Sequence, residues 1–250
     1  IAVDAPTGID LEKSTGATIF NADLTVTFAG FKKGLFYGKG YSKGGKIVKS
    51  PIGMSEDYFE ELPVDSYLIE PEDSFLGLPV KKLDSYKYSA GKVLVIAGSG
   101  ALPGAAFFAT NSSMEVGAGS AILAFPKSIK NLAQQNLDSA ILLPYNDEDE
   151  VLKEKNISEL EERIEWADVI AIGPGLGRDE STQNAVVKII KKNKNKIFVI
   201  DADAIYALRN DFGKISLKNC VLTPHHKEFA DLLGIEQKEL EADLLKSGKE

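Results

Sequence analysis

Strand-like and helix-like hydrophobic patterns alternate along the chain from Lys92 onward. Short apolar runs typical of buried parallel strands occur in KVLVIAG, GSAILAF, ADVIAIG, KIFVID and CVLTP. Helix-like spacing lies between or after them, in PGAAFFATNSSMEVG, Ser128 to Leu137, Thr182 to Lys192, Ala204 to Arg209, and KEFADLLG, which Gly234 ends. This alternation predicts an α/β fold with a mainly parallel sheet and helices on both faces.

The first part of the chain has a different pattern. A short apolar segment, Ile1 to Val3, precedes a Pro-Thr-Gly turn, and residues 24–28 alternate Leu, Val and Phe with two threonines, which predicts a half-buried strand. A glycine-rich stretch follows, with a short strand expected over 46–49, and periodicity is weak over 51–90. We therefore predict two domains, residues 1–62 and residues 63–250.

Composition narrows the class of protein. The 250 residues carry a net charge of −8 and no basic cluster long enough to follow a phosphate backbone, which argues against a nucleic-acid partner. One cysteine, Cys220, excludes an internal disulfide framework and fits a reducing compartment. No apolar segment is long enough to predict a membrane span. We expect a cytoplasmic protein, and, because the chain starts in mid-strand at Ile1, an internal fragment of a longer one.

Polar and glycine-rich loops follow several of the expected strands. These loops are AGSGALPG (97–104), GPGLGRD (173–179), DADA (201–204) and TPHHKE (223–228). In open parallel sheets, ligands bind at the carboxyl ends of the strands. The loops are therefore expected to line one cleft.

Neither glycine loop matches a standard nucleotide motif. The first has the spacing G-x-G-x-x-x-G, one residue longer than the dinucleotide fingerprint, and no acidic residue follows AILAF to hold a ribose hydroxyl. Neither loop ends in the Gly-Lys-Ser/Thr of a P-loop. For Gly173, Gly175 and Gly177 two interpretations stay open: a tight strand-to-helix turn without a ligand, or amides that meet an anion at the next helix.

Carboxylates and histidines in these loops are the other candidates. Asp201 and Asp203 could hold a cation or cap the following helix. His225 and His226 are adjacent, so a shared metal is disfavoured and one ring is expected to face the cleft as a hydrogen-bonding group. The chain has neither a Cys/His metal set nor a G-x-S-x-G elbow. Asp4, at an expected strand end, could act as a base or stabilise its turn.

Taken together, these motifs resemble the bifunctional NAD(P)H-hydrate repair enzymes. VDAPTGID and NADLTVTFAGFKKGL are similar to the closing part of the epimerase domain. KVLVIAGSGALPGAAFFA, VGAGSAILAFP, DVIAIGPGLGRD, FVIDADAIYAL and VLTPHHKEFADLLG follow the order of the dehydratase domain. The resemblance implies a ribokinase-like α/β dehydratase part, C-terminally incomplete, preceded by the C-terminal part of a Rossmann-like epimerase domain.

The resemblance also implies an activity and site residues. The activity is ADP-dependent dehydration of (S)-NAD(P)H hydrate, in which the hydroxyl is phosphorylated and phosphate is then eliminated, together with epimerisation of the R and S hydrates. Hydrate binding maps to Ala106, Gly175 and His225, the epimerase acid to Asp4, and a potassium ligand to Thr7. ADP or ATP, Mg²⁺ and assembly into homo-oligomers are also implied. A ribokinase-like small-molecule kinase and a non-catalytic nucleotide-binding protein are the alternatives.

This sequence departs from the family pattern in two ways. His226 and Lys227 stand where the family has Pro and Gly, and Tyr206 stands at an Asn. The NNGGDG-type loop, the lysine-led adenylate segment and the GGSGD loop with its catalytic Asp are not found between Ile1 and Glu250. We therefore expect the chain, as given, to be inactive in both reactions, with the nucleotide-binding residues unassigned.

Overall fold

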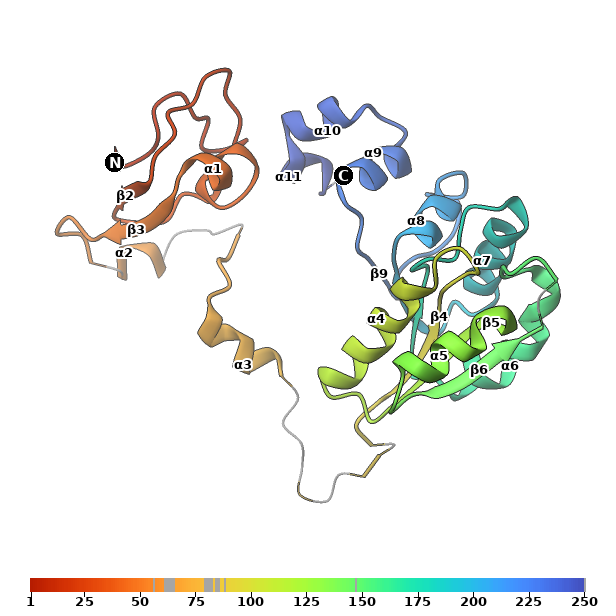
Figure 1. Cartoon of the computed structure of the whole chain (residues 1–250). Coiled ribbons are helices and arrows are strands. Elements are labelled where there is room, and N and C mark those ends of the chain that lie inside the picture. Colours follow the sequence, from red (N-terminus) through yellow and green to blue (C-terminus); the bar gives the residue numbers. More distant parts are fainter. Residues whose placement is uncertain are drawn as a thin grey trace. The chain divides into compact units, whose positions relative to one another are not determined.

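The computed structural model describes residues 1–55, 57–60, 66–78, 83, 86–87, 89–146 and 148–249 (Figure 1). The chain forms two compact units. Unit 1 comprises Ile1–Ser74 with Glu236–Glu250, and unit 2 comprises Phe75–Ile235. The domain boundary predicted between residues 62 and 63 lies outside the described residues.

Unit 2 is built on a parallel sheet of six strands in the order β6-β5-β4-β7-β8-β9. The strands are β4 (Lys92–Ile96), β5 (Ser120–Pro126), β6 (Ile141–Tyr145), β7 (Val169–Ile172), β8 (Ile197–Ile200) and β9 (Cys220–Leu222). The chain adds strands on one side of β4 and then returns to add β7 on its other side. This reversal places a topological switch point between β4 and β7, where ligands of doubly wound folds bind.

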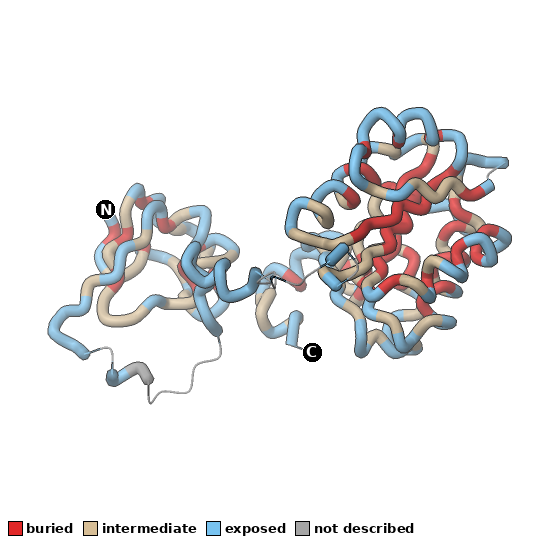
Figure 2. The backbone as a smooth tube through the Cα atoms, turned by 90° about the horizontal axis from the view of Figure 1, so that it is seen from below, coloured by how far each residue is buried: buried red, intermediate tan, exposed pale blue. Residues whose placement is uncertain are grey.

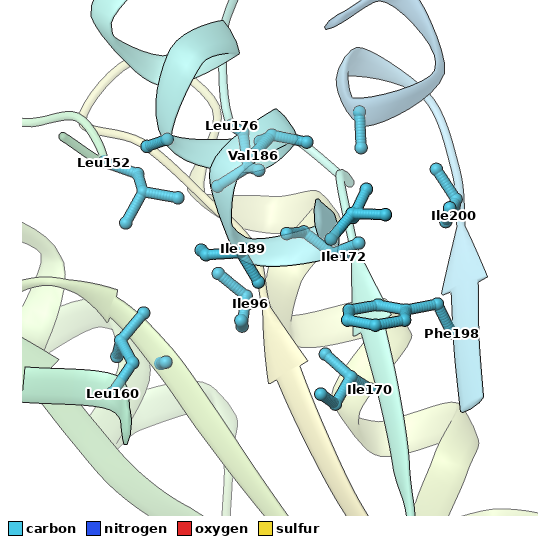
Figure 3. Close-up of a cluster of buried hydrophobic side chains, with 14 of the residues drawn as sticks. Ile96, Leu152, Leu160, Ile170, Ile172, Leu176, Val186, Ile189, Phe198 and Ile200 are labelled. Atoms are coloured by element: carbon cyan, nitrogen blue, oxygen red, sulfur yellow. The ribbon is translucent and has the colours of Figure 1, made fainter. Parts of the chain in front are cut away.

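Helices cover both faces of this sheet. On one face, α4 (Pro103–Glu115) and α5 (Lys130–Asn136) pack on strand residues such as Val95 and Leu123. On the other, α6 (Ile157–Trp166), α7 (Glu180–Lys192) and α8 (Asp203–Leu208) pack on residues such as Ile96 and Ile170 (Figure 3). Successive residues of β4 thus serve opposite cores, as the period of a strand requires. Buried residues concentrate in these strands (Figure 2), and the predicted α/β fold class is confirmed.

Two elements of unit 2, strand β6 and helix α6, were not predicted from the sequence. Strand β6 contains Pro144, which lacks the N–H a central strand needs, and β6 lies at the edge of the sheet where proline is tolerated. Helix α6 buries Ile157, Leu160 and Ile164. Their spacing is that of one helix face, so the sequence pattern was sufficient to predict this helix. Helix α9 (His226–Leu233) follows β9 and ends at Gly234, as predicted.

Unit 1 contains a smaller parallel sheet in the order β1-β2-β3. Its strands are β1 (Ala2–Val3), β2 (Leu24–Phe28) and β3 (Lys46–Ser50). The alternating strand is confirmed as β2, but its more buried face carries Thr25 and Thr27, not the apolar residues. The Thr25 hydroxyl donates to the Gly44 carbonyl at 2.6 Å, so burial leaves it satisfied.

The remaining elements are short. They are α1 (Gly38–Lys43), α2 (Asp57–Glu60), α3 (Ser74–Gly77), α10 (Gln237–Ala242), α11 (Leu244–Ser247), and 3-10 turns at Lys33–Leu35, Pro71–Asp73, Lys127–Ile129 and Glu154–Asn156. Over the described stretches of the chain, no helix is both long and apolar enough to cross a bilayer.

Candidate functional site

Four loops lie at the carboxyl ends of neighbouring strands of unit 2. They follow β4, β7, β8 and β9, which are adjacent in the sheet in that order. The prediction that these four loops share one sheet edge is therefore confirmed. The first two flank the switch point between β4 and β7, where a ligand crevice is expected.

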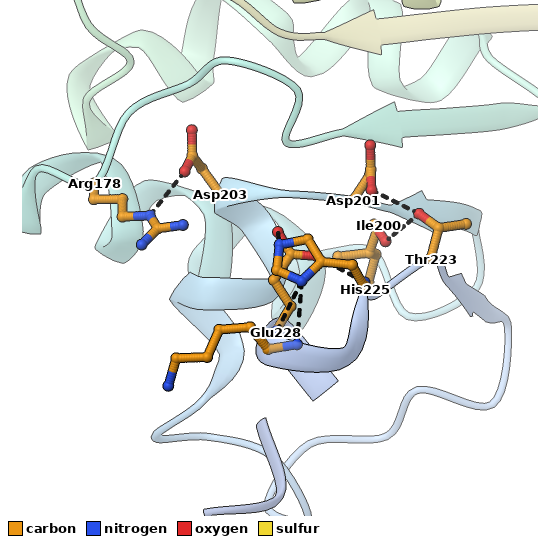
Figure 4. A network of polar contacts seen from close by, with 8 residues as sticks. Arg178, Ile200, Asp201, Asp203, Thr223, His225 and Glu228 are labelled. Carbon is orange, nitrogen blue, oxygen red and sulfur yellow. Dashed lines mark hydrogen bonds and ion pairs between the residues drawn. The ribbon is translucent and has the colours of Figure 1, made fainter. Parts of the chain in front are cut away.

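Hydrogen bonds join each of these loops to the next. The Gly98 N–H donates to the Pro174 carbonyl at 2.9 Å, which links the β4 and β7 loops. The Gly177 N–H donates to Asp203 Oδ2 at 2.9 Å, which links the β7 and β8 loops. The Thr223 hydroxyl donates to Asp201 Oδ1 at 2.8 Å and links the β8 and β9 loops (Figure 4). The edge is thus one connected polar framework.

Two glycines of the β7 loop allow neighbouring backbone to come close. Gly173 has φ +129° and Gly175 has φ +66°, in the region that favours glycine. A Cβ on Gly173 would overlap the Asp201 carbonyl oxygen, and a Cβ on Gly175 would overlap that of Leu102. These glycines therefore allow the β7 loop to pack closely against the neighbouring β8 and β4 loops.

Gly175 also presents an amide that the loop itself does not use. Gly175 is buried, and within the described ranges no group accepts a hydrogen bond from its N–H. A buried N–H of this kind ordinarily has a partner. The Gly175 N–H is therefore a candidate donor to a ligand, and both interpretations of the glycines keep support.

Asp203 anchors the β7 loop. Its side chain is 12 % exposed, and its two oxygens accept the Gly177 N–H and Arg178 Nε, the latter at 3.0 Å (Figure 4). Helix α8 has Ala202 as its N-cap residue and no side-chain cap. The interpretation of Asp203 as a helix cap is therefore wrong, because its oxygens accept from the β7 loop and not from the N–H groups of α8.

The carboxylates do not assemble a metal site in the described part of the chain. No three His, Cys, Asp or Glu side chains come together there as a ligand set. Ala202, between the two aspartates, has φ +47° and ψ −119°, a conformation that costs a non-glycine residue about 1–3 kcal/mol. Backbone strain of this kind is frequent at binding sites. The two aspartates on either side of Ala202 have different partners: Asp201 accepts from Thr223, and Asp203 accepts from the β7 loop.

His225 is the N-cap of α9. Its Nδ1 accepts from the backbone N–H groups of Lys227 and Glu228 at 3.2 and 3.3 Å. Its Nε2 lies 3.3 Å from Glu228 Oε1, and its backbone N–H donates to the same carboxylate. The side chain is nevertheless 66 % exposed. The His225 ring thus caps α9 and is at the same time largely exposed to solvent.

The capping role of His225 predicts a stability effect. His225→Ala removes the acceptor for two helix N–H groups and is expected to lower the free energy of unfolding by about 1 kcal/mol. His225→Asn keeps a side-chain acceptor and should stay within a few tenths of wild type. Chemical denaturation followed by circular dichroism measures both. Equal losses in the two variants would contradict the capping role.

Ala106 lies in the first half of α4 and is fully buried. A Cβ added at Gly98 would lie 3.0 Å from the Ala106 Cβ, so the methyl group packs beneath the β4 loop. Any contact with a ligand would therefore come from the backbone. The Gly104 and Ala105 N–H groups are suited to this because they lie in the first turn of α4, where a helix leaves N–H groups without intrahelical partners.

In unit 1, Asp4 lies at the end of β1 with φ +65°. Its Oδ1 accepts from Lys32 Nζ at 2.6 Å, from the Phe28 N–H at 2.9 Å and from the Thr27 hydroxyl at 3.4 Å. Lys32 Nζ also donates to the Phe28 carbonyl at 2.7 Å and to Thr27 Oγ1 at 3.0 Å. Lys32 could not be predicted from the sequence, because its pairing with Asp4 depends on β1 and β2 lying side by side.

The Lys32 ammonium and the Phe28 N–H hold the pKa of Asp4 below its ordinary value of 3.8. A carboxyl whose pKa is depressed by folding adds stability above its unfolded pKa and loses it as the pH falls through the folded pKa. We therefore expect unit 1 to lose stability below about pH 4. Carbon NMR titration of Asp4 should give a higher pKa in Lys32→Gln, and an unchanged titration would contradict the assignment.

Thr7 lies on the turn after β1. Its carbonyl accepts the Phe20 N–H at 2.9 Å, and the residue is exposed. Within the described residues its hydroxyl makes no hydrogen bond.

A family model described as NAD(P)H-hydrate dehydratase matches residues 93–250. The chain belongs to the NAD(P)H-hydrate dehydratase family. Bifunctional NAD(P)H-hydrate repair enzymes are similar to it over most or all of its length. The Escherichia coli K12 enzyme is 32 % identical over 261 residues, covering 100 % of this chain and 46 % of its own. The Pyrobaculum aerophilum enzyme is 34 % identical over 241 residues, covering 94 % of this chain and 45 % of its own.

Solved structures support the same family. A Bacillus subtilis ADP/ATP-dependent NAD(P)H-hydrate dehydratase co-crystallised with ATP and Mg²⁺ has a TM-score of 0.51 and 27 % identity, covering 66 % of this chain and 55 % of that one. An Enterococcus faecalis ribokinase-like superfamily protein has a TM-score of 0.55 and 26 % identity, covering 64 % and 54 %. The predicted ribokinase-like fold is confirmed for the dehydratase part.

This dehydratase-family chain spans about half the length of the curated relatives it matches. The match over residues 93–250 includes all four loops of the sheet edge. The edge is therefore the candidate active site of the family member.

Proposed function

We propose that unit 2 binds the hydrate of NADH or NADPH and serves its ADP- or ATP-dependent dehydration. The observation that carries this proposal is the connected edge formed by the loops of β4, β7, β8 and β9 in a chain of the dehydratase family. Beside β4 and β7, the Gly175 N–H is a backbone donor available to a polar ligand. A ribokinase-like small-molecule kinase is not favoured, because the family match describes a hydrate dehydratase.

Three residues are proposed to contact the hydrate. Gly175 would donate its N–H, Ala106 would contribute backbone near the start of α4, and His225 would present the open edge of its ring. These contacts orient the ligand and exclude water from its hydrated ring.

In the proposed reaction, the hydroxyl oxygen attacks the terminal phosphorus of the nucleotide as the hydroxyl proton is lost to solvent. The bond between that phosphorus and its bridging oxygen breaks, so that AMP leaves from ADP, or ADP from ATP. The phosphate then leaves with the oxygen that was the hydroxyl, and the ring double bond is restored when a neighbouring proton is lost. Mg²⁺ would accompany the nucleotide phosphates, its usual partners. Both Asp203 oxygens accept hydrogen bonds within the protein, whereas one Asp201 oxygen accepts none among the described residues.

Unit 1 is proposed to contribute to epimerisation of the R and S hydrates. The support comes from the names of the bifunctional relatives and from Asp4, a carboxylate that Lys32 keeps in its ionised form. Thr7 is proposed to offer its hydroxyl to a potassium ion, a cation that takes oxygen ligands.

Isothermal titration with NADPH hydrate, with NADPH as the control, tests the dehydratase proposal. The two ligands differ at the nicotinamide ring alone, so a preference reports recognition of the hydrated ring. We expect the hydrate to bind at least tenfold more tightly. Equal affinity, or no binding of the hydrate, would contradict the proposal.

A further inference from the structure

A small pocket lies beside His225, between α8 and α9. Its volume is about 100 Å³, and its lining includes Arg178, Tyr206, Arg209 and Lys227. These side chains come from the β7 loop, from α8 and its C-terminal end, and from the first turn of α9. We call it the α8–α9 pocket. It has room for a group larger than one water molecule.

Tyr206 holds two arginines in place. The Arg178 guanidinium carbon lies 4.3 Å from the Tyr206 ring centroid, and that of Arg209 lies 3.7 Å from it. Both guanidinium groups therefore lie against the Tyr206 ring. Arg209 Nη1 also donates to Gln183 Oε1 at 2.8 Å and to the Tyr206 carbonyl at 2.7 Å. Both cations are thus preorganised, which reduces the entropy lost on binding.

The two arginines retain donors that the protein does not use. Arg178 uses Nε for Asp203, and Arg209 uses Nη1, so within the described ranges their other guanidinium nitrogens have no acceptor. Figure 4 shows the terminal nitrogens of Arg178 directed away from Asp203. Donor groups of this kind, held in planar forks, match the oxygens of a phosphate.

The carboxylates of the pocket are committed elsewhere. Asp231 pairs with Lys227 Nζ at 2.6 Å, and Glu228 is turned to the backbone N–H and ring of His225. Arg209 has no carboxylate partner in the part of the chain that the structure describes. The groups left to bind a ligand in the pocket are therefore the remaining donors of the two arginines, which suit an anion.

We propose that the α8–α9 pocket binds a phosphate group of the ligand, with Arg209 and Arg178 as its donors. This assignment rests on the proposed function in one respect: the phosphate belongs to the hydrated dinucleotide. Tyr206 and Lys227, the two departures that line the pocket, both contribute to it. The pocket would therefore tune this chain's preference among phosphate-bearing forms of the cofactor.

The test is a set of titrations of the whole chain with inorganic phosphate, NADPH hydrate and NADH hydrate, followed by calorimetry. Arg209→Gln is expected to weaken phosphate and NADPH hydrate at least tenfold, since charge-assisted hydrogen bonds are lost. Tyr206→Leu, which frees both arginines, should weaken them severalfold. Lys188→Gln on α7 makes the same charge change at a side chain that pairs with Glu154, and should leave all three affinities unchanged.

The comparison of ligands identifies the phosphate. If Arg209→Gln loses affinity for NADPH hydrate but not for NADH hydrate, the pocket binds the 2′-phosphate. If it loses affinity for both hydrates equally, the pocket binds the pyrophosphate. Arg209→Gln that leaves every affinity unchanged, or wild-type chain that does not bind inorganic phosphate, would overturn the proposal. Phosphate binding that depends on Arg209 without any hydrate binding would keep the pocket and overturn the proposed function. Arg178→Gln repeats the test should Arg209→Gln not fold.

Discussion

Gly175→Ala is expected to lower the free energy of unfolding of unit 2 by about 3 kcal/mol. The substitution places a side chain at φ +66°, and its Cβ would overlap the Leu102 carbonyl oxygen of the neighbouring loop. Both backbone segments would have to shift, and the joint between β4 and β7 would open. Trp166, the single tryptophan, lies in unit 2, so its fluorescence during denaturation follows this unit.

Gly177→Ala is the matched control for that effect. Gly177 has φ +83°, but the nearest atom to an added Cβ is Asp179 Oδ2 at 3.7 Å, an ordinary contact. Its cost should therefore be that of backbone strain alone, about 1–2 kcal/mol. The difference between the two variants isolates the contact between loops. Equal costs would show that Gly175 is needed for its conformation and not for the approach of Leu102.

Asp203→Ala should lower the free energy of unfolding of unit 2 by about 2–3 kcal/mol. The carboxylate accepts a backbone N–H and an arginine, and its own side chain is largely buried. Its removal leaves the Gly177 N–H without an acceptor and frees the β7 loop. The same fluorescence measurement reports the loss.

Arg178→Ala provides the comparison. Arg178 is 54 % exposed, so its ion pair with Asp203 is screened by water, and its removal should cost less than about 1 kcal/mol. A double-mutant cycle between the two positions should therefore give a coupling energy below about 1 kcal/mol. A coupling that accounts for the whole effect of Asp203→Ala would mean that the arginine, and not the Gly177 amide, is the partner that matters.

The sequence was sufficient for the fold class because the buried runs and helix faces of unit 2 are strongly patterned. It also grouped the four loops correctly, since parallel strands bring their carboxyl ends to one edge. Strand β6 was missed because Pro144 weakens the strand signal, although an edge strand tolerates it. The alternation of β2 predicted the strand but not the burial of Thr25 and Thr27, which depends on acceptors far along the chain.

The hydrogen-bond partners of the site residues were harder to predict from the sequence than the fold. Asp203 lies at the start of α8, where a helix cap is the local expectation, yet its acceptor atoms are used by Gly177 and Arg178, residues of the preceding strand's loop. The pairing of Lys32 with Asp4 and the two arginines around Tyr206 likewise join segments distant in sequence. Such contacts follow from strand order and side-chain reach, which a single sequence does not specify.

The central claim is that the hydrated cofactor binds at the carboxyl edge of unit 2, beside β4 and β7. Amide NMR of the isotope-labelled chain during titration with NADPH hydrate tests this claim most directly. We expect saturable shifts in residues 97–106, 173–178 and 223–228, with the Gly175 amide among the largest. Saturable shifts confined to the opposite edge of the sheet or to unit 1, or no shifts at all, would contradict it.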